Sequence, residues 1–470
     1  MYCGYVVKVE KLRPHGNADR LQIATFFGND TCVGLDIVPG EIGIYFPTDG
    51  QLSVEYCDAN NLVRKKDENG NNIGGYLDPD KRNVTAVRLR GERSDGLYMP
   101  LSSLVFTGVN LDDINIGDTI TIVNGVEICR KYIPRSNKVS GGVPNGNRTR
   151  KKKVPVAPLF AEHADTEQLA YNLSAFRPGD QIEISLKIHG TSQRTGYLPV
   201  LKGYKRTLLD RLLRRDGTPI YNWGYVTGTR RTVLDNYDGG FYGGNAFREQ
   251  HAKRFEGKLY QGETVYYEVC GFTDTGTPIM SSSSNAKLND KEFIKQYGDT
   301  TIFSYGCEPT GSKTMIHEDI MGDRSFLPVE MPQSKMYVYR MTLTGPDGHV
   351  IDYTPDYMRY RCEQMGIDCV PVFWSGLIPE GEDLAFDIGT EKEQKTTAGE
   401  FIKYIAEKYY DGPDPIGKTH VREGVVVRVI NRPKFAAYKH KNFSFKVLEG
   451  LIKADASAPD MEEADGLTEE

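Results

Sequence analysis

Short stretches in which hydrophobic and polar residues alternate recur through the first 130 residues, and turn-forming residues separate them. A two-residue alternation is typical of strands that bury one face. The expected strands are Tyr5–Glu10, Leu21–Phe27, Ile42–Phe46, Val84–Leu89 and Asp118–Val123. The pattern therefore predicts a small β domain over residues 1–130.

About five short strands in a closed order fit an OB-type barrel, a fold that often binds nucleic acid. The segment Pro14–Leu21 is similar to the opening of OB domains in tRNA-binding proteins. Arg88, Arg90 and Arg93 cluster near the far end of this domain. They form either a contact for nucleic acid or an ordinary solvated hairpin.

The pattern changes after residue 130. Residues 131–158 contain glycine, proline and the basic run Arg148–Lys153, which cannot bury a core and predict a linker. Such a run is either a solvated tether or a phosphate contact. Residues 454–470 form an acidic tail that we expect to be disordered.

Between these segments, residues 159–453 combine longer strands with helical stretches, which indicates a second, α+β domain. The spacing of apolar residues predicts helices over Lys287–Tyr297 and Thr397–Tyr410. Residues 273–335 are rich in Ser, Gly and Pro and are expected to form a surface insertion.

Composition sets outer limits on these predictions. A chain of 470 residues predicts two or three domains. The net charge of −6 is misleading, because Lys453–Glu470 holds one lysine and seven acidic residues and accounts for all of it. The eight cysteines are scattered without a Cys-x-x-Cys pair, which favours reduced thiols in a cytoplasmic protein. We expect no membrane segment and no signal peptide, since no apolar run approaches the required length.

The strand-like run Gln181–Leu186 is followed at once by Lys187, and Gly190 and two hydroxyl residues come next. A glycine there would let the backbone approach a phosphate closely, and a lysine can serve as a nucleophile when its ammonium is destabilised. A Lys-x-x-Gly motif alone is weak, because it occurs by chance in a chain of this length.

Five further segments strengthen the interpretation. They are Thr227–Leu234 with Arg230 and Arg231, Tyr266–Gly271 with Glu268, Met336–Leu343 with Tyr337 and Tyr339, Arg422–Arg428 with Glu423, and Lys439–Lys446. The two-residue period places Lys439 and Lys441 on one face of a strand. Taken singly, each feature is more often an ordinary strand acid, solvated lysine or core tyrosine than a site residue.

Together, in this order, the segments resemble the motifs of covalent nucleotidyltransferases, and among them those of RNA ligases. The resemblance covers residues 160–453 and includes the Lys-His-Lys-Asn segment at Lys439. An OB-like domain at the start of the chain is similar to the Deinococcus-type RNA ligase. The resemblance implies an N-terminal OB-like β-barrel followed by a nucleotidyltransferase domain with ATP-grasp-like antiparallel sheets and helices.

What the resemblance implies for the site is specific. Lys187 would be the nucleophile that carries AMP, and the nucleotide would be held by Gly190, Arg230 or Arg231, Glu268, Tyr339, Glu423, Lys439 and Lys441. Glu268 would accept from the ribose, and Glu423 would also contact Mg²⁺ or Mn²⁺, since hard cations prefer carboxylate oxygens. The stacking ring is left open between Tyr337 and Tyr339, with Tyr339 favoured. His189 is expected to shape the loop.

The resulting hypothesis is an ATP-dependent RNA ligase that seals 3′-OH/5′-phosphate breaks in RNA repair. Its expected partner is a nicked duplex, RNA–RNA or RNA–DNA, with no membrane and no obligate protein partner. The alternatives are a guanylyltransferase, which would be labelled by GTP, and a nucleic-acid-binding protein whose transferase domain has lost its chemistry.

Overall fold

A computed structural model describes residues 2–66, 68–70, 73–133, 154–164, 166–212, 217–234, 237, 246–271, 273, 279, 315–318, 324–326, 334–380, 397–416 and 421–454. The chain divides into two compact units. The first comprises Met1–Arg135 and Phe443–Asp455, and the second comprises Ser136–Asn442 with Ala456–Glu470.

The N-terminal part of the first unit consists of short strands, as its sequence predicts. The strands β1 (Gly4–Lys8), β3 (Leu21–Phe26) and β5 (Ile42–Phe46) occupy three of the expected stretches. Two other stretches change partner midway. Val84–Leu89 divides into β7 (Asn83–Val84), which pairs with β6 (Gly50–Leu52), and β8 (Val87–Leu89), which pairs with β9 (Glu92–Ser94). Asp118–Val123 divides in the same way into β11 (Thr119–Ile120) and β12 (Ile122–Val123).

These strands pair antiparallel into several small sheets. The largest has the order β10-β5-β1-β11, in which β10 spans Leu97–Pro100. A second sheet joins β2 (Leu12–Pro14), β3 and β4 (Asn29–Gly34). A third has the order β14-β6-β7, in which β14 spans Cys129–Lys131, and the hairpin of β12 with β13 (Val126–Glu127) stands beside these sheets. The pairings among the described residues do not close into one barrel.

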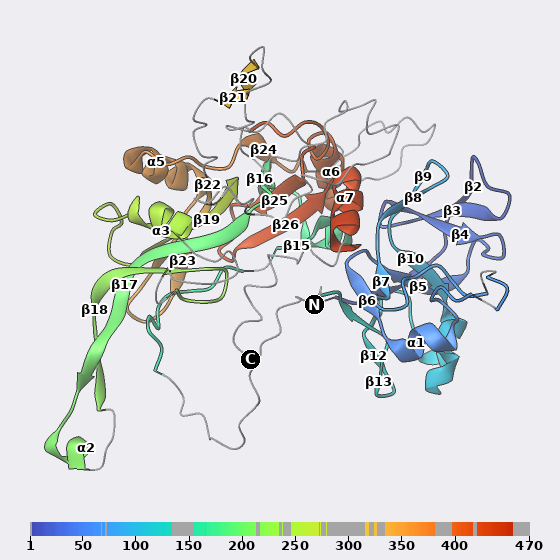
Figure 1. Cartoon of the computed structure of the whole chain (residues 1–470), viewed down its shortest axis with the longest axis horizontal. Coiled ribbons are helices and arrows are strands. Elements are labelled where there is room, and N and C mark those ends of the chain that lie inside the picture. The colour runs from blue at the N-terminus through green and yellow to red at the C-terminus, as the bar shows by residue number, and fades with distance from the viewer. Residues whose placement is uncertain are drawn as a thin grey trace. The chain divides into compact units, whose positions relative to one another are not determined.

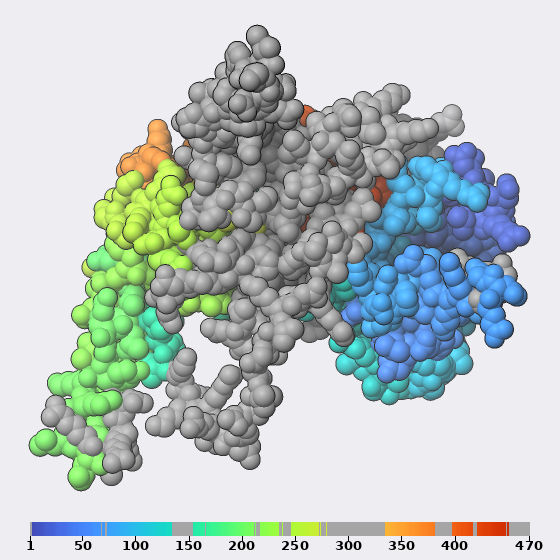
Figure 2. Space-filling model, viewed as in Figure 1, coloured from blue at the N-terminus to red at the C-terminus, as the bar shows by residue number. Residues whose placement is uncertain are grey.

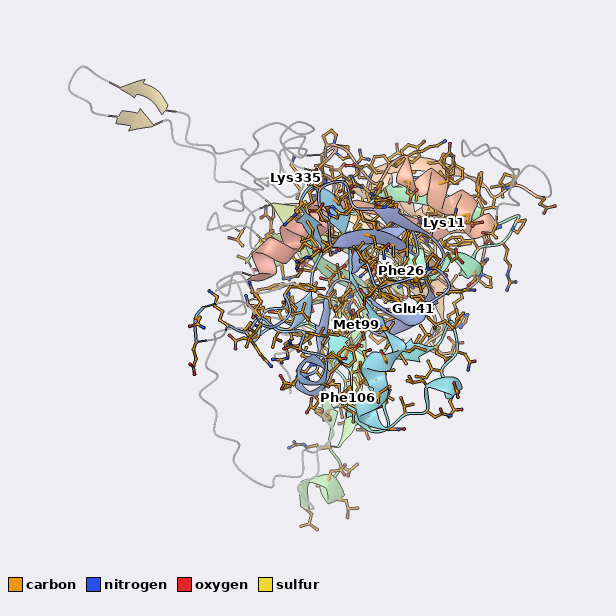
Figure 3. The ribbon with its side chains drawn as sticks, turned by 90° about the vertical axis from the view of Figure 1, so that its right-hand side faces the viewer. Lys11, Phe26, Glu41, Met99, Phe106 and Lys335 are labelled. Carbon is orange, nitrogen blue, oxygen red and sulfur yellow. The ribbon has the colours of Figure 1, made fainter. Side chains whose placement is uncertain are left out.

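Apolar side chains fix the interior of this unit. Ile44, Phe46 and Leu52 are fully buried there, together with Tyr56 of α1 (Val54–Ala59). Phe26, labelled in Figure 3, stacks on Tyr98 with their ring centroids 5.0 Å apart. The alternation of apolar side chains therefore produces a real core, as the sequence pattern predicts.

The last helix, α7 (Phe443–Ala454), groups with this unit and not with the strands that precede it. The guanidinium groups of Arg88 and Arg93 lie 5.6 and 5.2 Å from the centroid of the Phe443 ring. The Nζ of Lys446 lies 2.6 Å from an Oδ2 of Asp95. Two of the three clustered arginines, for which the sequence left a nucleic-acid contact or a solvated hairpin open, thus lie over an aromatic ring.

The second unit contains two antiparallel sheets of five strands each (Figure 1). One has the order β15 (Glu167–Gln168), β26 (Ala436–Lys441), β25 (Gly424–Val429), β16 (Gln181–Leu186), β24 (Val372–Leu377). The other has the order β18 (Thr218–Gly228), β17 (Thr191–Lys205), β19 (Glu263–Gly271), β22 (Ser334–Thr344), β23 (Val350–Asp352). Only the short β15–β26 pairing is parallel among the described strands of these sheets. A mixed α+β fold is thereby confirmed.

Helices complete this unit. They are α2 (Leu208–Leu212), α3 (Ala246–Lys253), α5 (Pro355–Met365) and α6 (Ala398–Glu407). The helix predicted over Thr397–Tyr410 is α6, which begins with a capping box between Thr397 and Glu400. Its buried residues Ile402 and Ala406 pack with strands β16 and β25.

Several predicted segments lie outside the described residues. They are the helix over 287–297, most of the linker and of the insertion, and the acidic tail. Within the described part of the chain, none of the helices combines the length and the apolar character that crossing a bilayer requires.

Candidate active site

Lys187 stands where strand β16 ends, at the edge of a large pocket of the second unit. Its backbone N–H donates to the carbonyl of Gly424 at 3.0 Å, which ties it to the start of β25. The pocket encloses about 1040 Å³, open solvent included, and Lys187, Arg230, Glu268 and Tyr339 all line it. Four residues that lie far apart in the sequence therefore share one cavity.

Glu423 is the electrostatic centre of the site. Its Oε1 lies 2.8 Å from Nζ of Lys187 and 3.3 Å from Nζ of Lys441, and its side chain is only 2% exposed. Burial disfavours the carboxylate, but the charges of Lys187 and Lys441 outweigh burial and hold the pKa of Glu423 well below its usual value. The carboxylate is thus ionised and shared by two cations.

The second oxygen of Glu423 faces His189. Nδ1 of His189 lies 3.3 Å from Oε2, and the imidazole is 9% exposed. Oε2 is buried, and its contact with the imidazole helps to lower the pKa of the Glu423 carboxyl while leaving lone-pair capacity on this oxygen. A buried carboxylate oxygen in this condition has spare capacity to bind a hard cation. His189, which the sequence assigns to loop shape, in fact contacts the carboxylate.

Gly190 is required by close packing. A Cβ at this position would lie 2.5 Å from the carbonyl oxygen of Val269, which is too close for any side chain. The following residues, Thr191 and Ser192, begin β17 and line the pocket. Arg248 of α3, which is buried, donates to Oγ1 of Thr191 at 2.8 Å and so fixes this turn.

The strands β19 and β22, in the same sheet as β17, continue this wall of the pocket. Glu268 and Tyr339 line the pocket, and the Tyr339 hydroxyl lies 2.9 Å from Oγ of Ser192. Burial and the nearby charge of Glu268 raise the pKa of Tyr339, so that its hydroxyl keeps its proton. Tyr337 is buried in the adjoining apolar cluster with Leu186 and Ile188, against which Tyr339 also packs, and it is not among the residues that line the pocket.

Arg230 and Arg231 have different environments. Arg230 lines the pocket, whereas Arg231 is exposed and its carbonyl accepts from Nη2 of Arg194 at 3.2 Å. Lys439 pairs with Val426 and Lys441 with Gly424 in the β25–β26 register. Lys439 is half-buried, and the ion pair to Glu423 belongs to Lys441.

The structure adds pocket residues that sequence reasoning missed. Glu183 and Ser185 line the cavity with Lys187, and Val426 and Arg428 face them from β25. The two-residue period of each strand was a usable signal for these residues. Oε2 of Glu183 accepts from Nη1 of Arg359 at 2.7 Å.

His163 and Phe435 also line the pocket, and they come from irregular segments in which no sequence period operates. Arg340 donates to Nδ1 of His163 at 3.5 Å and lies over the Phe435 ring, 4.3 Å from its centroid. Burial, followed by the charge of Arg340, lowers the pKa of His163 well below its usual value. The imidazole is therefore neutral at pH 7.

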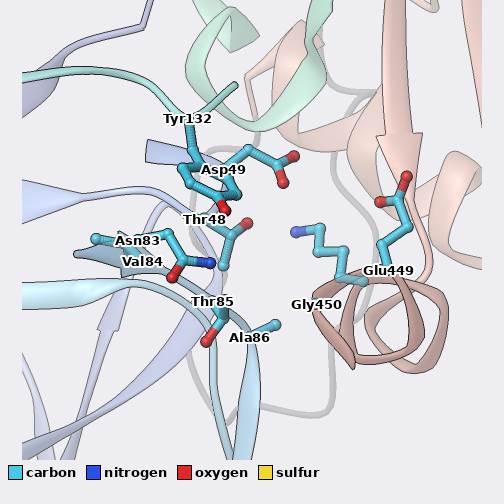
Figure 4. A pocket seen from close by; sticks show the side chains of 10 residues that line it. Thr48, Asp49, Asn83, Val84, Thr85, Ala86, Tyr132, Glu449 and Gly450 are labelled. Carbon is cyan, nitrogen blue, oxygen red and sulfur yellow. The ribbon is translucent and has the colours of Figure 1, made fainter. Parts of the chain in front are cut away.

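A second pocket, in the first unit, is much smaller and encloses about 300 Å³ (Figure 4). Asp49, in the turn before β6, and Asn83 of β7 line it together with Lys446 and Glu449 of α7. Lys446 already pairs with Asp95. Its small size and polar lining suit a hydrated gap between packed elements better than a binding site.

Comparisons with known proteins bear on the fold. No family model matches the sequence, and no curated protein matches it. Among solved structures, a mutant RNA ligase of Naegleria gruberi with AMP and manganese is similar, with 15% identity, a TM-score of 0.51, and coverage of 95% of this chain and 98% of that one. A second mutant of that ligase, with ATP and manganese, aligns with 14% identity and a TM-score of 0.50 over 96% and 98% of the two chains. At this identity the likeness establishes a shared fold.

Proposed function

We propose that this protein is an ATP-dependent RNA ligase that joins 3′-OH and 5′-phosphate RNA ends at duplex nicks. The observation that carries the proposal is the placement of Lys187 Nζ at the wall of a nucleotide-sized pocket, 2.8 Å from a buried carboxylate that a second lysine also contacts. The fold shared with an RNA ligase solved with ATP or AMP and manganese supports the same reaction class.

In the first step, the Lys187 amine attacks the α-phosphorus of ATP. A P–N bond forms, the P–O bond to pyrophosphate breaks, and the lysine loses its proton to solvent. In-line placement of the amine and cations around the phosphates supply the rate enhancement. Arg230, which lines the pocket, and Lys441, which contacts Glu423, are candidates for those cations, and Lys439 lies on the same strand as Lys441.

The residues present fit a divalent cation. Oε2 of Glu423 is a buried carboxylate oxygen with spare acceptor capacity, which Mg²⁺ or Mn²⁺ prefers. When bound, the cation would neutralise phosphate charge and compete with Lys187 for the carboxylate. Losing that counter-charge destabilises the ammonium and favours the free amine.

The nucleoside half of ATP would occupy the wall formed by β19 and β22. Tyr339 offers an aromatic face at the pocket surface, and Glu268 offers a carboxylate that can accept from ribose hydroxyls. In the next step AMP passes from Lys187 to the RNA 5′-phosphate. The RNA 3′-OH then attacks that phosphate, forms the new phosphodiester bond and releases AMP.

We assign the first unit, with its short antiparallel strands, to RNA binding as an OB-like domain of a Deinococcus-type ligase. The linker over residues 131–158 would add phosphate contacts through Arg148–Lys153. Selectivity for a nicked duplex would follow from the shape and 2′-hydroxyls of an A-form helix. The seven described cysteines are free thiols, which fits a cytoplasmic location.

The direct test is intact-mass analysis after incubation with ATP and Mn²⁺. We expect one added AMP that is absent from Lys187→Ala and present in Lys335→Ala, an exposed lysine of the same unit. Labelling by GTP alone would identify a guanylyltransferase instead. RNA binding without any adduct would indicate a transferase domain that has lost its chemistry.

A further inference from the structure

The hairpin formed by β17 and β18 extends well beyond the sheet to which it belongs (Figure 1). Pairing of β17 with β19 ends at Gly196, whereas its pairing with β18 continues to Lys205. The remaining nine residues of β17 form a two-stranded ribbon of roughly 30 Å. We call the part of the hairpin from Tyr197 to Tyr225 the arm.

One face of the arm collects its aromatic residues. Residues directly opposite each other in an antiparallel pair share a face, and so do alternate residues of one strand. The register pairs Tyr197 with Tyr225, Pro199 with Trp223, and Leu201 with Tyr221. A bulge after Leu201 then brings Tyr204 opposite Pro219, on the same face. All five aromatic side chains described in the arm therefore share this aromatic face.

The aromatic face runs from the core outwards. At its base, Tyr197 and Tyr225 pack against the buried cluster of the unit and stack on each other at 4.8 Å. The next ring, Trp223, lies 5.9 Å from Tyr197 and is 43% exposed, and Tyr204 is 37% exposed. The opposite face holds the equally exposed Ile220, 42%.

The two strands of the arm carry charge of one sign, whereas the segment that joins them contains Asp210 and Asp216. No acidic residue occurs from Thr191 to Leu209 or from Gly217 to Leu234. Lys202, Lys205 and Arg206, all exposed, follow each other along the outer half of β17 and just beyond it. In Figure 2 this half is the green projection that ends near α2. The register places Lys202 and Lys205 on the face opposite the rings, so the two strands present aromatic rings on one face and cations on the other, without carboxylates. A ribbon that combines rings with cations matches the surfaces on which nucleic-acid bases stack.

We propose that the arm binds RNA, with Trp223 and Tyr204 stacking on unpaired bases and with Lys202, Lys205 and Arg206 contacting phosphates. The proposal rests on the proposed function for its substrate class, and it adds an RNA contact outside the nucleotide pocket. The alternative partner of the arm is a protein surface, because Leu208 and Leu212 of α2 are exposed. The run of positive charge favours RNA.

The experiment uses the full-length protein and fluorescence anisotropy with labelled nicked RNA duplex and labelled single-stranded RNA. Trp223→Ala and Tyr204→Ala should each raise Kd for RNA by about 5- to 100-fold, as expected for loss of one stacked base. Ile220→Ala is the matched control, since it removes an equally exposed side chain from the opposite face. Replacing Lys202 and Lys205 by Gln should lower the slope of log Kd plotted against log salt concentration by about 1.5, because two phosphate contacts are lost.

Adenylylation of Lys187 and the melting temperature are measured on the same preparations. The proposal that the arm binds RNA is refuted if Trp223→Ala and Ile220→Ala bind RNA with equal Kd. It is also refuted if Leu208→Ser alters self-association while the aromatic variants leave RNA binding unchanged. Should the wild type fail to form an adduct while Trp223→Ala still weakens RNA binding, the arm stands and the ligase proposal falls.

Discussion

The Nζ of Lys187 lies 2.8 Å from Oε1 of Glu423, inside a site where both side chains are largely withdrawn from water. An ion pair at this distance favours the charged ammonium, which is not the nucleophilic form. The pair is therefore a resting arrangement. The proposed reaction at Lys187 would require that the carboxylate be drawn towards another cation, and Oε2, which faces His189, has acceptor capacity for it.

Glu423→Gln tests the energetic part of this arrangement. Removing the carboxylate leaves two buried lysines without their counter-charge, so the free energy of unfolding at pH 7 should fall by about 3 kcal/mol. Glu249→Gln, which breaks an exposed pair with Lys253 on α3, should have little effect. Urea unfolding of the three proteins measures both changes.

The pH dependence of that difference has a definite sign. Because the folded protein lowers the pKa of Glu423, the carboxylate stabilises the fold fully above the unfolded value near 4.5. As the pH falls below 4.5, the wild type should lose its advantage over Glu423→Gln. A stability difference that stays constant down to pH 3.5 would show that Glu423 is not the group responsible.

Tyr339 and Tyr337 can be separated by a second comparison. Tyr339→Ala should raise the ATP concentration needed for half-maximal adduct formation by about 10-fold, through loss of a stacking ring. Tyr339→Phe should stay near the wild type, because the ring remains. Tyr337→Ala removes a core side chain and should lower the melting temperature instead. The reverse assignment of effects would exchange the roles of the two rings.

This choice shows where sequence reasoning reached its limit. A strict two-residue period places Tyr337 and Tyr339 on one face of β22. In the structure the register between β19 and β22 shifts between Tyr266 and Tyr267, so Tyr339 is passed over in the pairing. Such a bulge changes the direction in which a side chain points. It depends on pairing with the partner strand, and the sequence pattern of one strand holds no information on that pairing.

Other parts were accessible because their signals are local. The helix α6 begins at Thr397 with Glu400 three residues later, a start signal that the sequence displays directly. The convergence of Lys187, Glu423 and Lys441 came from motif order, since no local pattern joins residues more than 200 positions apart. His163 reaches the pocket from an irregular segment, where neither signal exists.

His163 itself provides a fourth prediction. Burial lowers its pKa, so the folded state favours the neutral ring, and the stability it contributes is complete above pH 6.5 and declines as the pH falls. As the pH falls from 6.5 to 5, the free energy of unfolding of His163→Gln should therefore decrease less steeply than that of the wild type. Parallel curves for the two proteins would show that folding does not lower the pKa of His163.

The attachment of α7 to the first unit provides the last prediction. Nζ of Lys446 and Oδ2 of Asp95 lie 2.6 Å apart, and the side chains are only 17% and 5% exposed. The backbone of Asp95 is held independently, because its carbonyl accepts from Thr31 and Tyr45.

Lys446→Met and Asp95→Asn should therefore each remove this ion pair without displacing the strand. A double-mutant cycle should give a coupling free energy of about 1–2 kcal/mol in unfolding experiments. Independent, additive effects would show that Phe443 packing between Arg88 and Arg93, not this pair, holds the helix in place.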